Sequence, residues 1–94
     1  MKEAAITIFY PDVDTFDDYA KAVLGMLPDT RSFPGCLGAH VGINRDFFEI
    51  AVFQIWESKA HLDRYLTWRA EYGSFDTLSA TMRREQDFRT FSVP

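Results

Sequence analysis

The stretch Phe47–Leu66, FFEIAVFQIWESKAHLDRYL, decides the fold. Its first ten residues are rich in aromatic and β-branched side chains, which predicts a strand over residues 47–56. Successive side chains of a strand point to opposite faces. One face here carries Phe48, Ile50, Val52 and Trp56, and the other carries Phe47, Ala51, Phe53 and Ile55. A half-exposed strand normally has one polar face, so the second apolar face of this strand needs a cover.

The residues after this strand predict a helix. Ser58 is placed to cap its start, and His61 lies off its apolar side, where we expect it to be solvated. The stripe that faces the sheet consists of Leu62, Tyr65, Leu66 and Arg69. Gly73-Ser74 predicts a break before a short third helix. That third helix would carry Phe75, Leu78 and Met82.

The segments on either side complete the pattern. Residues 5–10 predict a first strand, which Pro11 ends. Asp14 suits the N-cap of a helix whose apolar residues recur at steps of three and four, and Pro28 is expected to end or break that helix. Its apolar positions are Phe16, Tyr19, Ala20, Val23, Leu24 and Leu27. Strands are predicted over residues 36–43 and 87–93, and the polar turn Asn44-Arg45-Asp46 predicts a hairpin.

The resulting order is βαββαβ, which predicts an α+β, ferredoxin-like fold with a four-stranded antiparallel sheet and helices on one face. The length of 94 residues predicts a single domain over residues 1–94. Helices on one face leave the second face of strand 47–56 uncovered. We therefore expect a homodimer in which a second copy covers the sheet face. The alternative is a mid-sheet strand with some exposed aromatic residues.

Composition excludes several classes of function. The net charge is −4, and the sequence has no stripe of basic residues with interleaved aromatic residues. Both features argue against nucleic acid as a partner. No segment has the apolar length of a signal peptide or a membrane span, so we expect no membrane partner. The single cysteine, Cys36, rules out an internal disulfide and fits a reducing compartment, which favours a cytoplasmic location.

Cofactor motifs are missing from the sequence. There is no glycine-rich phosphate loop and no Gly-x-Ser-x-Gly elbow. One cysteine and two isolated histidines, His40 and His61, lack the spacing of a metal site. We therefore expect no cofactor and no metal.

Several aromatic and polar residues are candidates for a site, and each also has a structural explanation. Trp56 is either core filling or a pocket wall. His40 lies beside Gly38 and Gly42, which leave space either for a ligand or for a dimer partner. Tyr65 faces the sheet, so its hydroxyl group needs a partner if it is buried. Three further candidates near the end of the second helix are Trp68 and Tyr72, which suit a lid, and Arg69, which could reach a ligand carbonyl.

Four segments resemble the antibiotic biosynthesis monooxygenase superfamily, and in particular its quinol monooxygenases. They are FPGCLGAHV (33–41), QIWES (54–58), AHLDRYL (60–66) and FRTFSVP (88–94). The resemblance implies a dimeric α/β barrel built from two ferredoxin-like subunits. It also implies cofactor-independent oxygenation of a phenolic, quinol or polyketide-like aromatic substrate. In such a site Trp56, Tyr65 and His40 would be catalytic. Trp68, Arg69, Tyr10 and Tyr72 would bind the substrate.

Other branches of the superfamily fit less well. Haem-degrading relatives use an asparagine on the first strand with a tryptophan and a histidine on the second helix. Asn44 is the only asparagine here, and Tyr65 and Phe75 stand near the other two positions. Gln54 stands on strand three, where polyketide-oxidising relatives have an asparagine. A non-oxidative enzyme on the same barrel (a cyclase, dehydratase or lyase) and a non-catalytic small-molecule-binding dimer remain alternatives.

Overall fold

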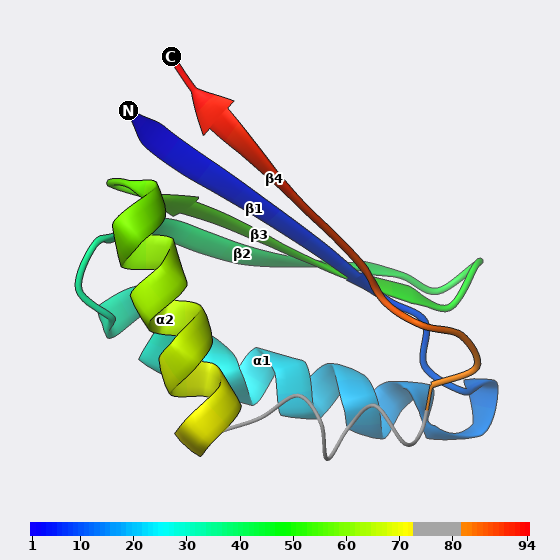
Figure 1. Ribbon diagram of the computed structural model, residues 1–94. Helices are drawn as coiled ribbons and strands as arrows, with labels where there is room; N and C mark the ends of the chain where they lie inside the picture. Colours follow the sequence, from blue (N-terminus) through cyan, green and yellow to red (C-terminus); the bar gives the residue numbers. More distant parts are fainter. Residues whose placement is uncertain (73–81) are drawn as a thin grey trace.

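The computed structural model describes residues 1–72 and 82–94. The elements, in chain order, are β1 (Lys2–Phe9), the 3₁₀ turn η1 (Val13–Thr15), α1 (Phe16–Ser32), β2 (Cys36–Asn44), β3 (Glu49–Trp56), α2 (Lys59–Tyr72) and β4 (Asp87–Val93). The strands form one antiparallel sheet in the order β2-β3-β1-β4. Both α1 and α2 lie on the same side of this sheet (Figure 1). The predicted α+β, ferredoxin-like fold is confirmed.

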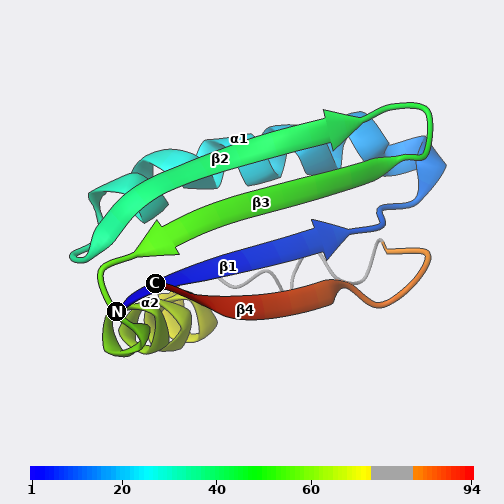
Figure 2. The ribbon, with the colours of Figure 1, turned by 90° about the horizontal axis from the view of Figure 1, so that it is seen from above.

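The sheet has a helix side and an open face, and their side chains differ in exposure. On β3, Ile50, Val52, Gln54 and Trp56 are buried toward the helices, whereas Phe53 and Ile55 are 44% and 37% exposed. Figure 2 looks onto the face that α1 and α2 do not cover. Cross-strand register places the following residues on this open face: Ala4, Ile6, Ile8, Gly38, His40, Gly42, Ala51, Phe53, Ile55, Arg89 and Phe91. The predicted division of β3 into two faces is therefore confirmed.

The buried residues form two clusters on the helix side. The first lies between α1 and the sheet and contains Phe9, Phe16, Tyr19, Ala20, Val23, Ile50 and Val52. The second lies under α2 and contains Ala5, Trp56, Leu62 and Tyr65. Figure 2 shows α2 at the end of the sheet where both chain termini lie, while α1 runs along β2. The second cluster therefore joins α2 to the ends of β1 and β3.

The prediction that Pro28 ends or breaks the first helix is wrong, because α1 continues through it to Ser32. Pro28 is exposed, so the carbonyl group that lacks an intrahelical partner can be solvated. The last turn of α1 is held by side chains that follow Pro28 in the sequence. Thr30 Oγ1 lies 2.7 Å from Tyr65 Oη, and Arg31 Nε donates to the Ala39 carbonyl group at 3.0 Å. These tertiary contacts outweigh the local preference for a helix end.

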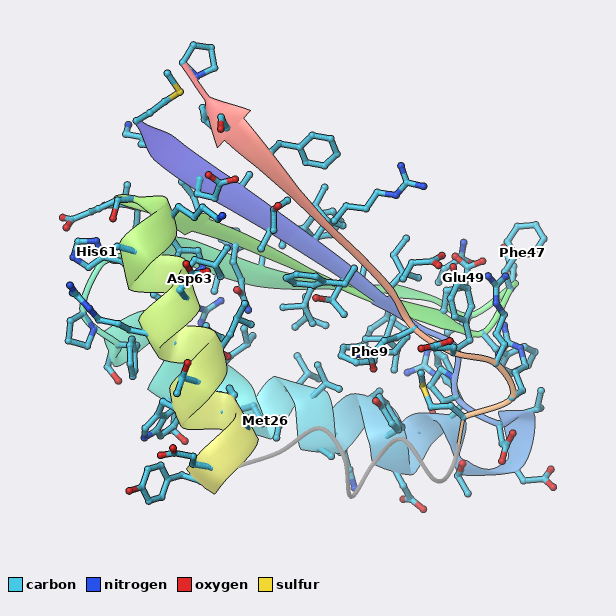
Figure 3. All side chains as sticks on the ribbon, viewed as in Figure 1. Phe9, Met26, Phe47, Glu49, His61 and Asp63 are labelled. Atoms are coloured by element: carbon cyan, nitrogen blue, oxygen red, sulfur yellow. The ribbon has the colours of Figure 1, made fainter. Side chains whose placement is uncertain are left out.

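The hairpin between β2 and β3 is longer than predicted. Phe47 and Phe48 belong to the turn, because β3 begins only at Glu49. The Asn44 side chain accepts hydrogen bonds from the backbone N–H groups of Asp46 and Phe47, at 3.1 and 3.2 Å. Phe48 adopts a left-handed conformation with φ 54°, and its ring packs edge-on against Phe16. Phe47 is left at the tip of the hairpin, where it is 68% exposed (Figure 3).

Other element ends differ slightly from prediction. β1 begins at Lys2 and ends at Phe9, because Lys2 and Glu3 pair with β4. The N-cap of α1 is Thr15, not Asp14, and its side chain makes no capping bond. Ser58 caps α2 as predicted, since its Oγ accepts the His61 N–H at 3.3 Å. The predicted break at Gly73-Ser74 and most of the third helix lie outside the described residues.

Candidate functional site

Trp56 and Tyr65 are brought together at the end of the sheet below α2. Their ring centroids are 4.8 Å apart, and Phe33 contacts both rings edge-on. Trp56 is fully buried, and its indole N–H donates to Gln54 Oε1 at 3.1 Å. Trp68 packs against Phe33 and Tyr65 from the outer side. The predicted pair therefore forms the centre of an aromatic cluster.

The Tyr65 hydroxyl group has the partners that burial requires. Arg69 Nε donates to Tyr65 Oη at 2.8 Å, and Arg69 Nη2 donates to Thr30 Oγ1 at 2.9 Å. The oxygens of Tyr65 and Thr30 lie 2.7 Å apart. Arg69 is only 4% exposed, and its guanidinium group lies over the Trp68 ring at 4.9 Å. This arrangement holds a cation in the protein interior, where its field is poorly screened.

A small cavity adjoins this hydrogen-bonded set. It lies between α1 and the sheet, and Arg69 Nη2 also bonds the Met26 carbonyl group nearby at 2.8 Å. About 10 Å³ of it admits the centre of a water molecule, which is roughly the space for one water. Met26 lies on α1 (Figure 3). The lining residues are Val23, Met26, Leu27, Thr30, Val41, Val52, Gln54 and Tyr65. The cavity is therefore aliphatic with a polar end.

Three of the seven predicted site residues meet at this place, and a fourth is adjacent. Tyr65 lines the cavity, Arg69 bonds to Tyr65, and Trp56 lies behind Gln54 without reaching the cavity wall. Trp68 packs on the outside of the cluster. Tyr72 contacts Trp68 at a ring distance of 6.4 Å but is 74% exposed.

His40 lies on the other side of the sheet. It is exposed on the open face and pairs directly across from Phe53. A Cβ atom at Gly38 would lie 3.9 Å from His40 Nε2, so the neighbouring glycine does leave space beside the ring. His40 borders a surface depression of about 290 Å³, whose other lining residues are Arg31, Cys36, Leu37, Gly38 and Ala39. The structure therefore separates His40 from Trp56 and Tyr65.

Tyr10 is also remote from the cavity. It follows the end of β1 that lies away from Trp56, and its hydroxyl group donates to Asp87. That hydrogen bond is the main cause that raises the pKa of Tyr10. The guanidinium group of Arg84 stacks on the Tyr10 ring at 4.1 Å. Tyr10 therefore joins β1 to the start of β4.

His61 is less solvated than predicted. Its Nδ1 lies 2.7 Å from Ser58 Oγ, and its Nε2 lies 3.6 Å from a carboxylate oxygen of Glu57. Gly35, at φ 92°, lies against the ring so closely that a Cβ atom there would come within 2.3 Å of it. His61 therefore packs against the loop before β2.

The sequence analysis did not identify Thr30 or Gln54 as site residues, although the sequence pattern around each of them indicates a buried polar side chain. Thr30 continues the α1 stripe of Val23 and Leu27 at helical spacing, and the expected break at Pro28 concealed it. Gln54 lies between Val52 and Trp56 on the buried face of β3. A polar residue in the middle of a buried alternating pattern indicates either a structural hydrogen bond or a site.

Within residues 1–72 and 82–94, no three His, Cys, Asp or Glu side chains group closely enough to hold a metal ion. No helix in these ranges is both long enough and apolar enough to cross a membrane.

Comparison with known proteins defines the class. The family model described as antibiotic biosynthesis monooxygenase matches residues 4–70. The chain therefore belongs to the antibiotic biosynthesis monooxygenase family. No curated protein sequence matches it.

Solved structures show the same fold. Rv0793 from Mycobacterium tuberculosis is 22% identical with a TM-score of 0.78, over 100% of this chain and 96% of that one. A structure described as an antibiotic biosynthesis monooxygenase is 16% identical with a TM-score of 0.85, over 98% and 99% of the two chains. A conserved protein from Methanosarcina mazei is 12% identical with a TM-score of 0.85, over 97% and 91%.

Proposed function

We propose that this protein is a cofactor-independent monooxygenase that oxidises a small phenolic, quinol or polyketide-like aromatic substrate with dioxygen. The observation that carries the proposal is the hydrogen-bonded set of Arg69, Tyr65 and Thr30 at the polar end of an otherwise aliphatic cavity. Membership of the antibiotic biosynthesis monooxygenase family supports the same class of reaction.

In this reaction the substrate supplies all the electrons. In a substrate such as anthrone, the ring CH₂ group that is conjugated through the aromatic rings with the ketone loses a proton, and the negative charge spreads over the carbon and the ketone oxygen. The carbon forms a bond to dioxygen, and protonation gives a hydroperoxide. Loss of water then breaks the O–O bond and leaves a carbonyl group, so one oxygen atom enters the product and the other leaves as water. The protein has to stabilise the anion and keep the site dry.

The buried side chains are suited to stabilising such an anion. The guanidinium charge of Arg69 acts on the cavity through the Tyr65 hydroxyl group, to which it donates at 2.8 Å. Because the cavity walls are aliphatic, this field is stronger than it would be in water. Trp68 and Tyr72 would form the outer side of the site. His40 takes no part in this cavity.

Oxygen uptake by metal-free protein tests the proposal. Anthrone and a naphthohydroquinone serve as the substrate panel, and their uncatalysed oxidation is subtracted. We expect protein-dependent uptake with one dioxygen consumed per product formed. Product formation under nitrogen would instead identify a non-oxidative enzyme. Ligand binding without turnover would identify a binding protein.

We further propose that a second copy of the chain covers the open face, in a homodimer. Phe53, Ile55 and Phe91 give this face three large apolar side chains that are each at least one-third exposed. An apolar sheet face of this kind marks an interface, and a two-fold contact between identical faces closes it. The resemblance to dimeric α/β barrels supports the same arrangement. We place the protein in the cytoplasm, where the lone Cys36 would stay reduced.

A further inference from the structure

The cavity between α1 and the sheet is too small for an aromatic substrate. About 10 Å³ of it admits the centre of a water molecule, which is roughly the room for one water or for another molecule of two or three atoms. Its walls are packed side chains, and close-packed protein interiors resist expansion. The aromatic substrate of the proposed reaction therefore lies beside this space, and only a much smaller molecule fits inside it.

Most of the cavity wall is aliphatic. Val23, Met26 and Leu27 contribute to it from α1, Val41 from β2 and Val52 from β3. Such a wall offers dispersion contacts and no side-chain hydrogen bonds, which favours an apolar molecule over water. In other proteins, dry cavities with walls of this kind bind small apolar molecules and xenon.

The hydroxyl protons at the polar end of the cavity are used within the protein. Thr30 donates its proton to the Met26 carbonyl group at 3.2 Å, so the Tyr65 proton fills the 2.7 Å contact with Thr30. Arg69 donates to both hydroxyl oxygens. Among the described lining residues, Gln54 is the remaining polar one, and its Oε1 already accepts an indole N–H. A buried water needs about two to four polar partners, so this end is poorly equipped to hold one.

We propose that this cavity binds dioxygen, the second reactant of the proposed reaction. Dioxygen is apolar, has two atoms and needs no hydrogen-bond donor, so it matches the size and the walls of the space. Apolar surroundings also take up such a gas more readily than water does. The assignment rests on the proposed function, which supplies the need for dioxygen, and it gives the two reactants separate places.

The charge of Arg69 suits the anion that forms from bound dioxygen. When the carbanion carbon of the substrate bonds to one oxygen atom, its electron pair breaks the π bond of dioxygen and leaves a negative charge on the other oxygen atom. Arg69 is buried at the polar end of the cavity, where it bonds to Tyr65 and Thr30. Its positive field is poorly screened there, so it favours the peroxide anion over free dioxygen.

Met26 and Val41 place the entrance of the cavity between α1 and β2. Both are partly exposed, whereas the other lining residues are buried. Strand β2 is an outer strand of the sheet, and α1 runs along it (Figure 2). Met26 has an unbranched side chain with several rotatable bonds, so it can move aside for a small molecule at low cost. Dioxygen therefore enters at the outer edge of the sheet.

Paramagnetic relaxation by dissolved dioxygen tests the assignment without turnover. The relaxation rates of methyl protons are measured by NMR under equal pressures of dioxygen and of nitrogen, and the difference reports contact with dioxygen. We expect this difference at Val23 and Val52 to exceed that at Leu62 by about threefold or more. Leu62 is the matched control, because it is similarly buried in the second core cluster and does not line the cavity.

Val52→Ile and Val23→Ile each add one methylene group to the wall of the cavity. Either change should fill the space and lower the dioxygen effect at Leu27 to the level at Leu62. Val13→Ile is the matched control, since it adds the same atoms at a side chain that is 54% exposed, and it should leave the effect at Leu27 unchanged. Two filling variants are compared, so that one remains informative if the other unfolds.

Oxidation of a panel substrate provides a second readout for the same variants. Val52→Ile should raise the KM for dioxygen by about threefold or more and leave the KM for the aromatic substrate unchanged, because that substrate lies outside the cavity. A general disturbance of packing would instead change both constants.

Three results would overturn the assignment. One is a dioxygen effect at Val23 and Val52 that is no larger than at Leu62, as expected if a water molecule occupies the cavity. Another is an undiminished effect at Leu27 in both filling variants. The third is loss of dioxygen binding with an unchanged KM for dioxygen. Failure of the monooxygenase proposal looks different, because dioxygen then still binds among the cavity methyl groups and no substrate in the panel causes oxygen uptake.

Discussion

Strand β3 carries large apolar side chains on both faces, and the molecule completes the two faces differently. On the helix side Trp56 is fully buried, and its indole N–H, Tyr65 and Arg69 all have hydrogen-bond partners within the chain. On the open face Phe53 and Ile55 remain partly exposed to solvent. The helix side is thus packed within one chain around a small polar-ended cavity. The open face carries partly exposed apolar side chains that a second molecule can cover.

The largest expected effect belongs to the helix side. Trp56→Ala removes a fully buried ring from the second core cluster, so it should lower the free energy of unfolding by about 3–5 kcal/mol. Trp68→Ala is the matched control, because the only other tryptophan of the chain is partly exposed and should cost clearly less. Urea denaturation of both variants measures the difference. Equal losses of unfolding free energy in the two variants would show that the buried Trp56 contributes no more to stability than the partly exposed Trp68.

The next effect belongs to the open face. Phe53→Lys introduces a charge in each copy of a two-fold interface, so it should raise the dissociation constant of the homodimer on the order of 100-fold. Sedimentation equilibrium should give twice the 10.9 kDa chain mass for the wild type and a single-chain mass for the variant. Phe47→Lys makes the same change at the hairpin tip and should leave the dimer intact. A wild type that sediments only at 10.9 kDa would refute the interface.

A smaller, pH-dependent effect comes from the first core cluster. Burial raises the pKa of Tyr19 to about 12, and within the described residues its hydroxyl group has no hydrogen-bond partner. The folded state therefore holds this proton more tightly than the unfolded state, whose value is 10.0. Protonated Tyr19 therefore adds fully to the free energy of unfolding below pH 10. The free energy of unfolding falls by about 1–3 kcal/mol as pH rises toward 12.

Tyr19→Phe tests this source of pH dependence. The variant should match or exceed wild-type stability at pH 8, because it removes an unbonded buried hydroxyl group. Its unfolding free energy should also fall less steeply between pH 10 and 12, as measured by urea denaturation. Identical pH profiles would mean that Tyr19 ionises equally well in the folded protein.

Much of the fold was predictable because alternation and helical spacing are local signals. The two faces of β3 and the stripe of α2 follow from side-chain periodicity, and the Ser58 cap follows from the preference for serine at a helix start. The error at Pro28 arose because contacts with other elements decide the outcome: Thr30 and Arg31 hold the α1 turn beyond the proline, and these contacts are not visible in the local sequence. The error at the hairpin is local, because the Asn44 side chain accepts the backbone N–H of Phe47, three residues further on, and extends the turn.

The site was predictable in part for the same reason. The sequence placed Tyr65 toward the sheet and required a partner for its hydroxyl group, and the structure supplies Thr30 and Arg69. It could not assign His40 to the opposite face, since that depends on the register between β2 and β3. Gln54 was noted only as a departure from relatives, because its hydrogen bond with the Trp56 indole N–H forms only in the folded strand.

The most direct test of the functional site is the rate of oxygen uptake by Tyr65→Phe, measured under conditions where the variant is folded. The substitution removes only the hydroxyl group that links Arg69 to the cavity. We predict a loss of about tenfold to a thousandfold in rate, with about 1 kcal/mol lost from the free energy of unfolding. An unchanged rate together with lowered stability would contradict the account. The cluster would then be packing alone, and the site would have to be sought at His40 on the open face.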